Sequence, residues 1–154
     1  MRKFFLLCVL LVSFGTAGSV KSQVSGYGFG IILGEPTGLS AKYWLDGRKA
    51  LNFGLAYSFV TNANALALHC DYVIHNNNLF DTKVTLPVYY GFGARIRAGN
   101  NDNSSLGARG VVGILYQFTN AHVDAFAEAA PVFNLFPKTT LHIDIAIGAR
   151  YFFR

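Results

Sequence analysis

The chain has 154 residues, of which 52% are hydrophobic and only 14% are charged, and its formal net charge is +5. Its length allows one domain, and its apolar content excludes an intrinsically disordered chain. Soluble domains carry about 25% charged residues, so this deficit indicates that much of the folded surface does not face water.

The N-terminal stretch has the three parts of a secretory signal peptide. Arg2 and Lys3 are basic, residues 4–14 form an apolar run, and residues 15–19 are small. This order is typical of an exported chain whose first segment is removed. We therefore predict a signal peptide over residues 1–22, with cleavage near its end.

Residues 23–154 form the predicted folded domain. Within it, apolar and polar side chains alternate with a period of two, and short breakers rich in Gly, Asn, Asp, Pro and Thr separate the alternating stretches. Such alternation predicts β-strands, and connections this short join antiparallel neighbours. We predict eight strands, at residues 24–34, 38–46, 50–59, 64–75, 84–98, 105–118, 123–136 and 140–153.

The two faces of these strands differ in composition. One face is apolar and uncharged, as in the run of Ile143, Ile145 and Ile147, whereas every charged strand residue falls on the other face, among many Gly and Ala residues. Two folds fit this pattern. A soluble lipocalin-like barrel would bury the apolar face, and a transmembrane barrel would turn it toward lipid.

The composition of the polar face favours the membrane barrel. A soluble surface is about 25 to 35% charged and poor in glycine, whereas an eight-stranded lumen is narrow and uses glycine to make room for large ionic groups. Aromatic residues also lie near the strand ends of the apolar face, as interfacial girdles do. We predict an all-β fold: a closed eight-stranded antiparallel up-and-down transmembrane β-barrel preceded by a signal peptide. The soluble lipocalin-like ligand-binding barrel is the alternative.

Five stretches of the domain carry a family resemblance, namely residues 30–44, 68–72, 86–91, 126–128 and 148–152. They resemble small eight-stranded outer-membrane β-barrel proteins of diderm bacteria, similar to the transmembrane domain of outer-membrane protein A. The most specific match is the Gly-Glu-Pro-Thr-Gly sequence of residues 34–38. The resemblance implies a fold and an outer-membrane location reached through the periplasm, without a particular chemistry. One departure is that Arg154 follows the aromatic Phe153, where such barrels usually end in the aromatic residue.

Ionisable residues of the polar face would share the lumen, where each charge needs a partner. Arg150 should pair with Asp124 or Glu128, because the last two predicted strands form a hairpin. We predict a lumen ionic network of Lys42, His69, Asp71, Arg95, Arg97, Arg109, Asp124, Glu128, His142, Asp144 and Arg150.

Counting from the turns divides these charges into two levels. The end that carries turn 35–37 would hold Lys42, Arg95, Arg97 and Arg109 with Asp144, and the deeper level would hold mainly carboxylates. A positive outer end could bind lipopolysaccharide-like anions. The competing interpretation, which we favour, is that strand tilt brings Arg95 and Arg109 to the deeper carboxylates.

Two constellations on the polar face suggest chemistry. His69 with Asp71 and His142 with Asp144 repeat one inward dipeptide that could bind zinc. Ser40 and Ser58 share the face with them, which raises a lipid-modifying enzyme as the alternative function. A deacylase, however, presents its nucleophile to lipid, and an acyl-measuring enzyme needs an apolar lumen. We therefore predict no metal, no cofactor and no catalytic residue.

The expected role is that of a structural or surface-interaction protein of the bacterial outer membrane. Removal of Arg2, Lys3 and, depending on the cleavage bond, Lys21 lowers the net charge from +5 to +3 or +2. The remaining arginines alternate with apolar residues, so nucleic acid is not an expected partner. The expected partners are outer-membrane lipid, lipopolysaccharide-like anions and the barrel insertion machinery. A monomer is expected, with the oligomeric state left open.

Overall fold

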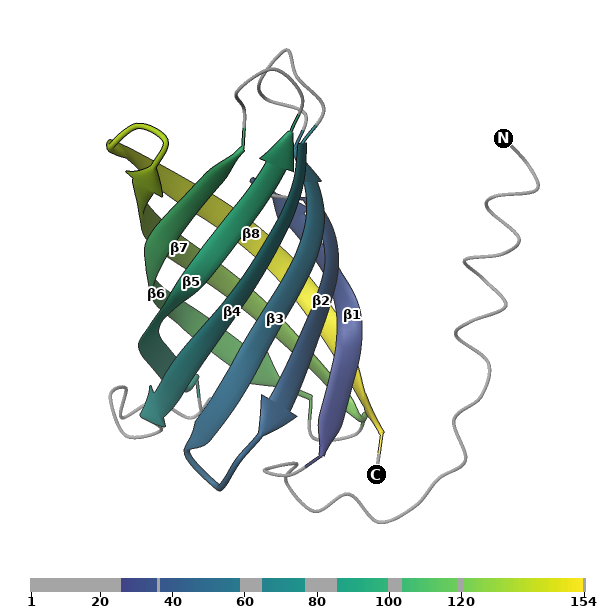
Figure 1. Ribbon diagram of the computed structural model, residues 1–154. Coiled ribbons are helices and arrows are strands. Elements are labelled where there is room, and N and C mark those ends of the chain that lie inside the picture. Colours follow the sequence, from purple (N-terminus) through teal and green to yellow (C-terminus); the bar gives the residue numbers. More distant parts are fainter. Residues whose placement is uncertain are drawn as a thin grey trace, which may run out of the picture.

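The computed structural model describes residues 26–35, 37–58, 65–76, 86–99, 104–118 and 121–153. Eight strands form from them (Figure 1): β1 (Tyr27–Gly34), β2 (Thr37–Trp44), β3 (Lys49–Ser58), β4 (Ala65–Asn76), β5 (Val88–Gly99), β6 (Ser105–Gln117), β7 (Val123–Phe136) and β8 (Thr140–Phe153). Each strand pairs antiparallel with the next, and β8 pairs with β1 to close the barrel. The predicted closed eight-stranded antiparallel barrel is therefore confirmed.

The predicted strand bounds agree with the structure to within a few residues, and the largest difference concerns β5. Of the predicted strand 84–98, residues 84 and 85 lie outside the described residues, and β5 begins at Val88, directly after Pro87. Proline has no N–H to donate to a ladder, so Pro87 contributes only its carbonyl, which accepts a 2.9 Å hydrogen bond from the backbone N–H of Leu115. The predicted signal peptide, residues 1–22, lies outside the described residues.

The barrel wall is apolar on its outer face and polar on its inner face. Phe92 and Ile145 are 71% and 66% exposed on the outside, whereas Asp71 and Arg109 are buried inside. This arrangement is the reverse of the lipocalin-like alternative, in which the apolar face would fill the interior. Among the described residues, no helix has the length and apolar character needed to cross a membrane.

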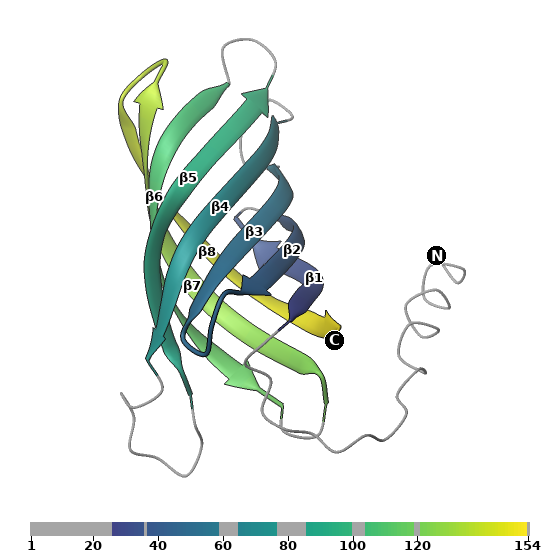
Figure 2. The same cartoon turned by 60° about the horizontal axis from the view of Figure 1, so that its bottom comes forward.

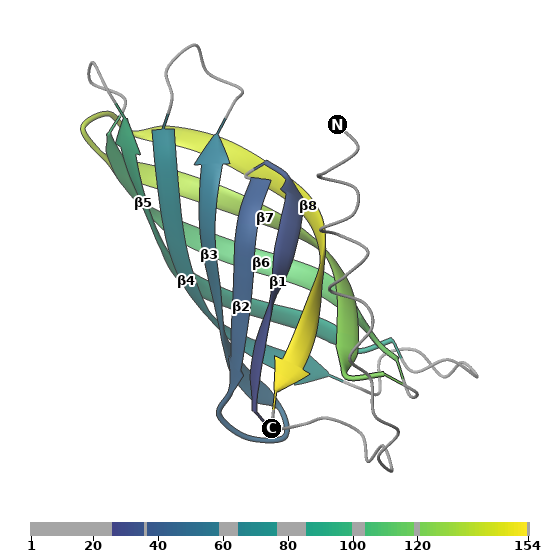
Figure 3. The same ribbon diagram turned by 90° about the vertical axis from the view of Figure 1, so that its right-hand side faces the viewer.

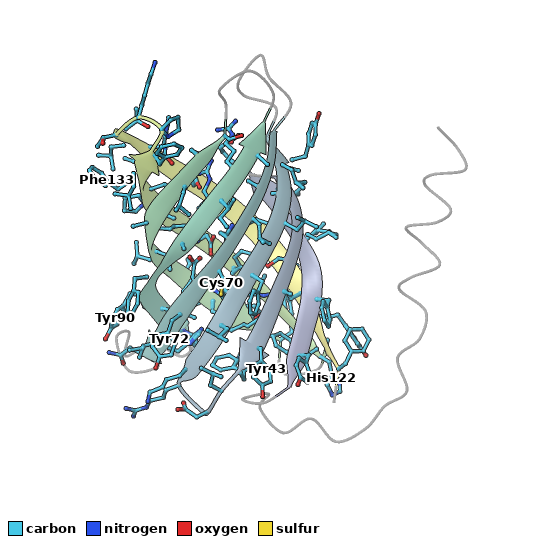
Figure 4. The ribbon with its side chains drawn as sticks, viewed as in Figure 1. Tyr43, Cys70, Tyr72, Tyr90, His122 and Phe133 are labelled. Atoms are coloured by element: carbon cyan, nitrogen blue, oxygen red, sulfur yellow. The ribbon has the colours of Figure 1, made fainter. Side chains whose placement is uncertain are left out.

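Tyrosines gather at the end of the barrel that holds the start of β1 and the end of β8, which we call the lower end as it appears in Figure 1. Figure 4 shows Tyr43, Tyr72 and Tyr90 near this end. The Tyr27 ring stacks on Tyr43 with 4.7 Å between centroids, and Tyr151 on β8 is exposed at the same end. Tyrosines in such a ring are typical of a membrane–water interface.

The register of the strands gives their tilt. The path starts at Phe152 on β8 and goes from each residue to its register partner on the next strand, through β1 to β7. It returns to β8 at His142, ten residues from its start, so the shear of the barrel is ten residues. For eight strands this shear corresponds to a tilt of about 40°. One residue then rises about 2.5 Å along the barrel axis, and one step to the next strand changes the level by about 3 Å. Equal residue counts from a turn therefore do not mean equal depth.

The turn between β2 and β3 is held by its aspartate. Asp46 Oδ1 accepts hydrogen bonds from the backbone N–H groups of Arg48, at 2.7 Å, and Lys49, at 2.8 Å. These bonds stabilise the carboxylate and lower the pKa of Asp46 below its ordinary value. The carbonyl of Arg48 in turn accepts a 2.7 Å hydrogen bond from the backbone N–H of His75, which fixes the turn to β4.

Candidate functional site: the charged lumen

Most of the predicted network residues lie inside the barrel with almost no exposure. The alternation of each strand turns them inward, because residues two apart share a face. The following are each at most 7% exposed: Lys42, His69, Asp71, Arg95, Arg109, Asp124, Glu128, Asp144 and Arg150.

Arg109 is the centre of the network. Its Nη1 donates to Asp71 on β4, and its Nη2 donates to Glu128 Oε1 on β7 at 2.8 Å. The second oxygen of Glu128 accepts a 2.7 Å hydrogen bond from the Tyr89 hydroxyl on β5. One arginine and one tyrosine thus join four strands across the lumen, and both donors point to carboxylates.

A second pair lies nearer the upper end. Arg95 Nη1 donates to both oxygens of Asp144, at 2.8 and 2.6 Å, and so joins β5 to β8. The same Asp144 carboxylate lies 4.0 Å from Arg109 Nε. Both arginines therefore contact carboxylates on other strands, which is the arrangement expected if strand tilt, rather than a bound anion, neutralises them.

A third pair lies toward the lower end. Arg150 Nε donates to Asp124 Oδ1 at 3.0 Å, so the structure gives Arg150 one of the two partners expected for it. The guanidinium also stacks over Phe126, with 4.1 Å from Cζ to the ring centroid. Register explains the pairing, because Asp124 and Arg150 are direct cross-strand partners in the β7–β8 hairpin.

Lys42 lies at the opposite end from the one expected, and this corrects the predicted charge levels. Its Nζ lies 2.7 Å from His75 Nε2, beside the Trp44 ring at 4.4 Å and the Tyr89 ring at 5.4 Å. His75 Nδ1 lies 3.1 Å from the carbonyl of Arg48, so Nδ1 donates there and Nε2 accepts from the ammonium group. A histidine and two aromatic faces surround this cation.

Sequence reasoning missed the partners of Lys42. His75 falls on the same face as Asp71 by the period of two, and Trp44 falls on the same face as Lys42. That signal was present in the alternation. The alternation does not give the height of each residue along the barrel axis, because the shear of ten residues moves β4 along that axis relative to β2.

Two predicted members of the network lie at the upper rim. Arg97 is half-buried, and His142 is exposed. His142 Nε2 lies 3.4 Å from the Thr140 hydroxyl oxygen. His142 therefore departs from the buried network that was expected to include it, because β8 extends here beyond the level of the lumen carboxylates.

The two His-x-Asp dipeptides occupy different environments. His69 is buried, with Nε2 at 4.0 Å from Asp71 Oδ2, whereas His142 is exposed and Asp144 is bonded to Arg95. Within the described residues, no group of three His, Cys, Asp or Glu side chains is placed to hold a metal ion.

Ser40 and His69 come from neighbouring parts of the lumen wall. The His69 ring covers Gly54, which lies between them in the register, and a Cβ at Gly54 would collide with that ring. Ser40 is buried, at 6% exposure. An acyl chain outside the barrel would have to cross the wall to meet these side chains. The side chain of Ser58 lies outside what the structure describes.

A closed barrel of eight antiparallel strands, apolar outside and ionic inside, is the architecture of outer-membrane β-barrel proteins. No family model matches the chain, and no curated protein matches it either. Among solved structures, the chain is similar to the N-terminal β-barrel domain of Pseudomonas aeruginosa OprF, with a TM-score of 0.59 and 17% sequence identity over 86% of this chain and 100% of that one. At this identity the likeness establishes the fold. It confirms the resemblance to small eight-stranded outer-membrane barrels.

Proposed function

We propose that the protein is an integral outer-membrane β-barrel with a structural or surface-interaction role, and that its lumen is closed to ions by its own side chains. The observation that carries this proposal is the chain of contacts through Arg109. Its guanidinium, the two carboxylates it bonds and the Tyr89 hydroxyl are all buried in the middle of the barrel.

A stable conductance would require these contacts to open. Opening the lumen would separate these buried charges from their partners and leave them uncompensated, which favours the closed arrangement. The ion pairs of the network come from five consecutive strands, β4 to β8, and cross-link these strands inside the barrel. This cross-linking supports a structural role over that of a channel.

A lipid-modifying enzyme is the less favoured function. Such an enzyme needs its nucleophile and base where an acyl chain can reach them. In this barrel Ser40 and His69 face the lumen, and the outer face presents aliphatic and aromatic side chains to the surroundings. The buried ionic interior also differs from the apolar pocket that would hold an acyl chain.

Three measurements test the proposal. The folded barrel should migrate differently before and after boiling on a gel and should stay in the membrane fraction; a monomer that is soluble without detergent would contradict it. In planar bilayers it should give no stable open conductance, which a long-lived open level would overturn. Lipid mass spectrometry of a deletion strain should show unchanged lipid A acylation. A defined gain or loss of one acyl chain would instead support the enzyme.

A further inference from the structure

The upper rim of the barrel is uneven, and its step lies between β8 and β1. The β1–β8 ladder ends at the pair of Gly34 with Ala146. Beyond it, β8 continues to Thr140, and among the described residues its further register partners lie on β7. Figures 1 and 2 show the β7–β8 hairpin reaching past the end of β1, and Figure 3 shows β1 and β2 as short strands in front of β8.

The step leaves backbone groups of β8 facing the gap. The Ile145 carbonyl accepts a 3.0 Å hydrogen bond from the backbone N–H of Glu35, so the amide groups of Ile145 point toward β1. Groups two residues apart on a strand point the same way. The N–H and C=O of Ile143 and Leu141 therefore point to the side where β1 has ended, and no described residue pairs with them there.

This edge lies at membrane depth. At about 2.5 Å of axial rise per residue, Ile143 stands about 20 Å and Leu141 about 25 Å above Tyr151, whereas the apolar band of such barrels is about 25 Å tall. The outward side chains agree, because Leu141 and Ile143 are 65% and 66% exposed. On the other side of the step, Gly34 pairs with Ala146, five residues above Tyr151 on β8. With the change of about 3 Å from one strand to the next, Gly34 stands only about 16 Å above Tyr151. The β1 side of the wall therefore ends about 9 Å below the top of the band.

The energies decide how this step is accommodated. Leu141 stands at the upper edge of the band and Ile143 inside it. The N–H and C=O of Ile143, left without a partner in hydrocarbon, would each cost about 2 kcal/mol or more. Local thinning of the bilayer costs only a fraction of a kcal/mol per Å. About 5 Å of thinning brings headgroups to Ile143, and this costs less than leaving its backbone groups in hydrocarbon. The lipid headgroup layer should therefore come down to the free edge of β8 at this step between β8 and β1, which we call the seam.

The chemistry of the seam fits one component of a headgroup. Two backbone N–H donors point into it, and the cationic Lys138 and the exposed His142 lie on the same hairpin. Phosphate oxygens accept such donors and are drawn to such cations. A strand from another protein would gain little, because the free edge offers only two residues, fewer than ordinary paired strands have. We infer that the step between β8 and β1 binds the phosphate of a membrane lipid through the N–H groups of Leu141 and Ile143.

This inference rests on the proposed membrane location and is tested with the barrel, isotope-labelled for amide NMR, in phosphatidylcholine nanodiscs. One sample contains lipid spin-labelled on the headgroup, and another contains lipid spin-labelled in mid-chain. The headgroup label should broaden the Leu141 and Ile143 amides more strongly than those of Ile96 and Leu106, which lie near the same end but pair on both sides. Equal broadening at both sites, or dominance of the mid-chain label at the seam, would overturn the inference.

A variant tests the donors themselves. Ile143→Pro removes an N–H that faces the seam and leaves the β7 ladder intact, so the barrel should fold and the headgroup effect at Leu141 should fall. The control is His142→Pro, which removes a donor on the β7 side and should lower the unfolding midpoint. An unchanged headgroup effect in folded Ile143→Pro would refute the assignment of the donors. Failure of the unmodified barrel to enter nanodiscs would instead refute the membrane location.

Discussion

Removal of the Arg109 guanidinium is the sharpest perturbation of the lumen. In Arg109→Ala, the carboxylates of Asp71 and Glu128 lose their shared donor and remain buried near each other. At an effective dielectric constant of about 20, each pair contributes roughly 4 kcal/mol of attraction. Measured losses for breaking one buried pair are about 3 to 5 kcal/mol. Because two carboxylates lose their donor here, we expect the free energy of unfolding to fall by about 5 kcal/mol.

The assay is urea unfolding of the barrel in lipid vesicles, followed by the gel shift between folded and unfolded forms. With a urea dependence of about 2 kcal/mol per M, the midpoint should fall by roughly 2.5 M. A loss below about 1 kcal/mol, which is the range of exposed ion pairs, would refute the argument that Arg109 holds the network together.

A charge-free control separates lost pairing from lost packing. In the triple variant Arg109→Met, Asp71→Asn and Glu128→Gln, no charge remains uncompensated at the centre, so most of the stability should return. If the triple variant is as unstable as Arg109→Ala, then the volume of the side chains rather than their charge is what matters there.

Three further predictions use the same unfolding assay. Arg150→Ala leaves buried Asp124 unpaired and should lose about 3 to 5 kcal/mol, well beyond Arg97→Ala at the half-buried rim; equal small losses would contradict the layered network. Gly30→Ala places a Cβ against the backbone of Ala149 and Arg150 and should be strongly destabilising, whereas Gly110→Ala meets only Pro131 Cγ at 3.6 Å and should be tolerated; the reverse order would be evidence against the register. Ile147→Lys on the lipid face should lose about 2 to 4 kcal/mol in lipid, and the idea of a lipid-facing β8 fails if the variant is neutral there.

Much of the fold could be predicted from the alternation of side chains. Period two assigns each residue to a face without any knowledge of neighbouring strands, and the lack of charge on one face indicated which one is outside. That logic placed Asp71, Arg109 and Glu128 together in the lumen. It left open which of them pair, because pairing depends on register across strands.

The errors have the same physical origin. Lys42 was expected among the upper cations, but β2 has only eight residues and Lys42 lies near its lower end, beside His75. His142 was expected in the network, but β8 has 14 residues and carries it to the exposed rim. Counting along one strand gives distance from a turn, whereas depth also depends on the length of that strand and the shear of the barrel.

The uneven distribution of ion pairs has a mechanical consequence. The ion pairs described inside the lumen all lie among the five strands from β4 to β8, for example Arg95 with Asp144 and Arg150 with Asp124. A force applied at the N-terminus first unzips β1, which meets its neighbours through backbone hydrogen bonds and small residues such as Gly30. A force applied at the C-terminus extracts β8 and must rupture buried charges in its first step. Pulling a single barrel from the two ends should therefore give different first rupture forces, with the higher one at the C-terminal end.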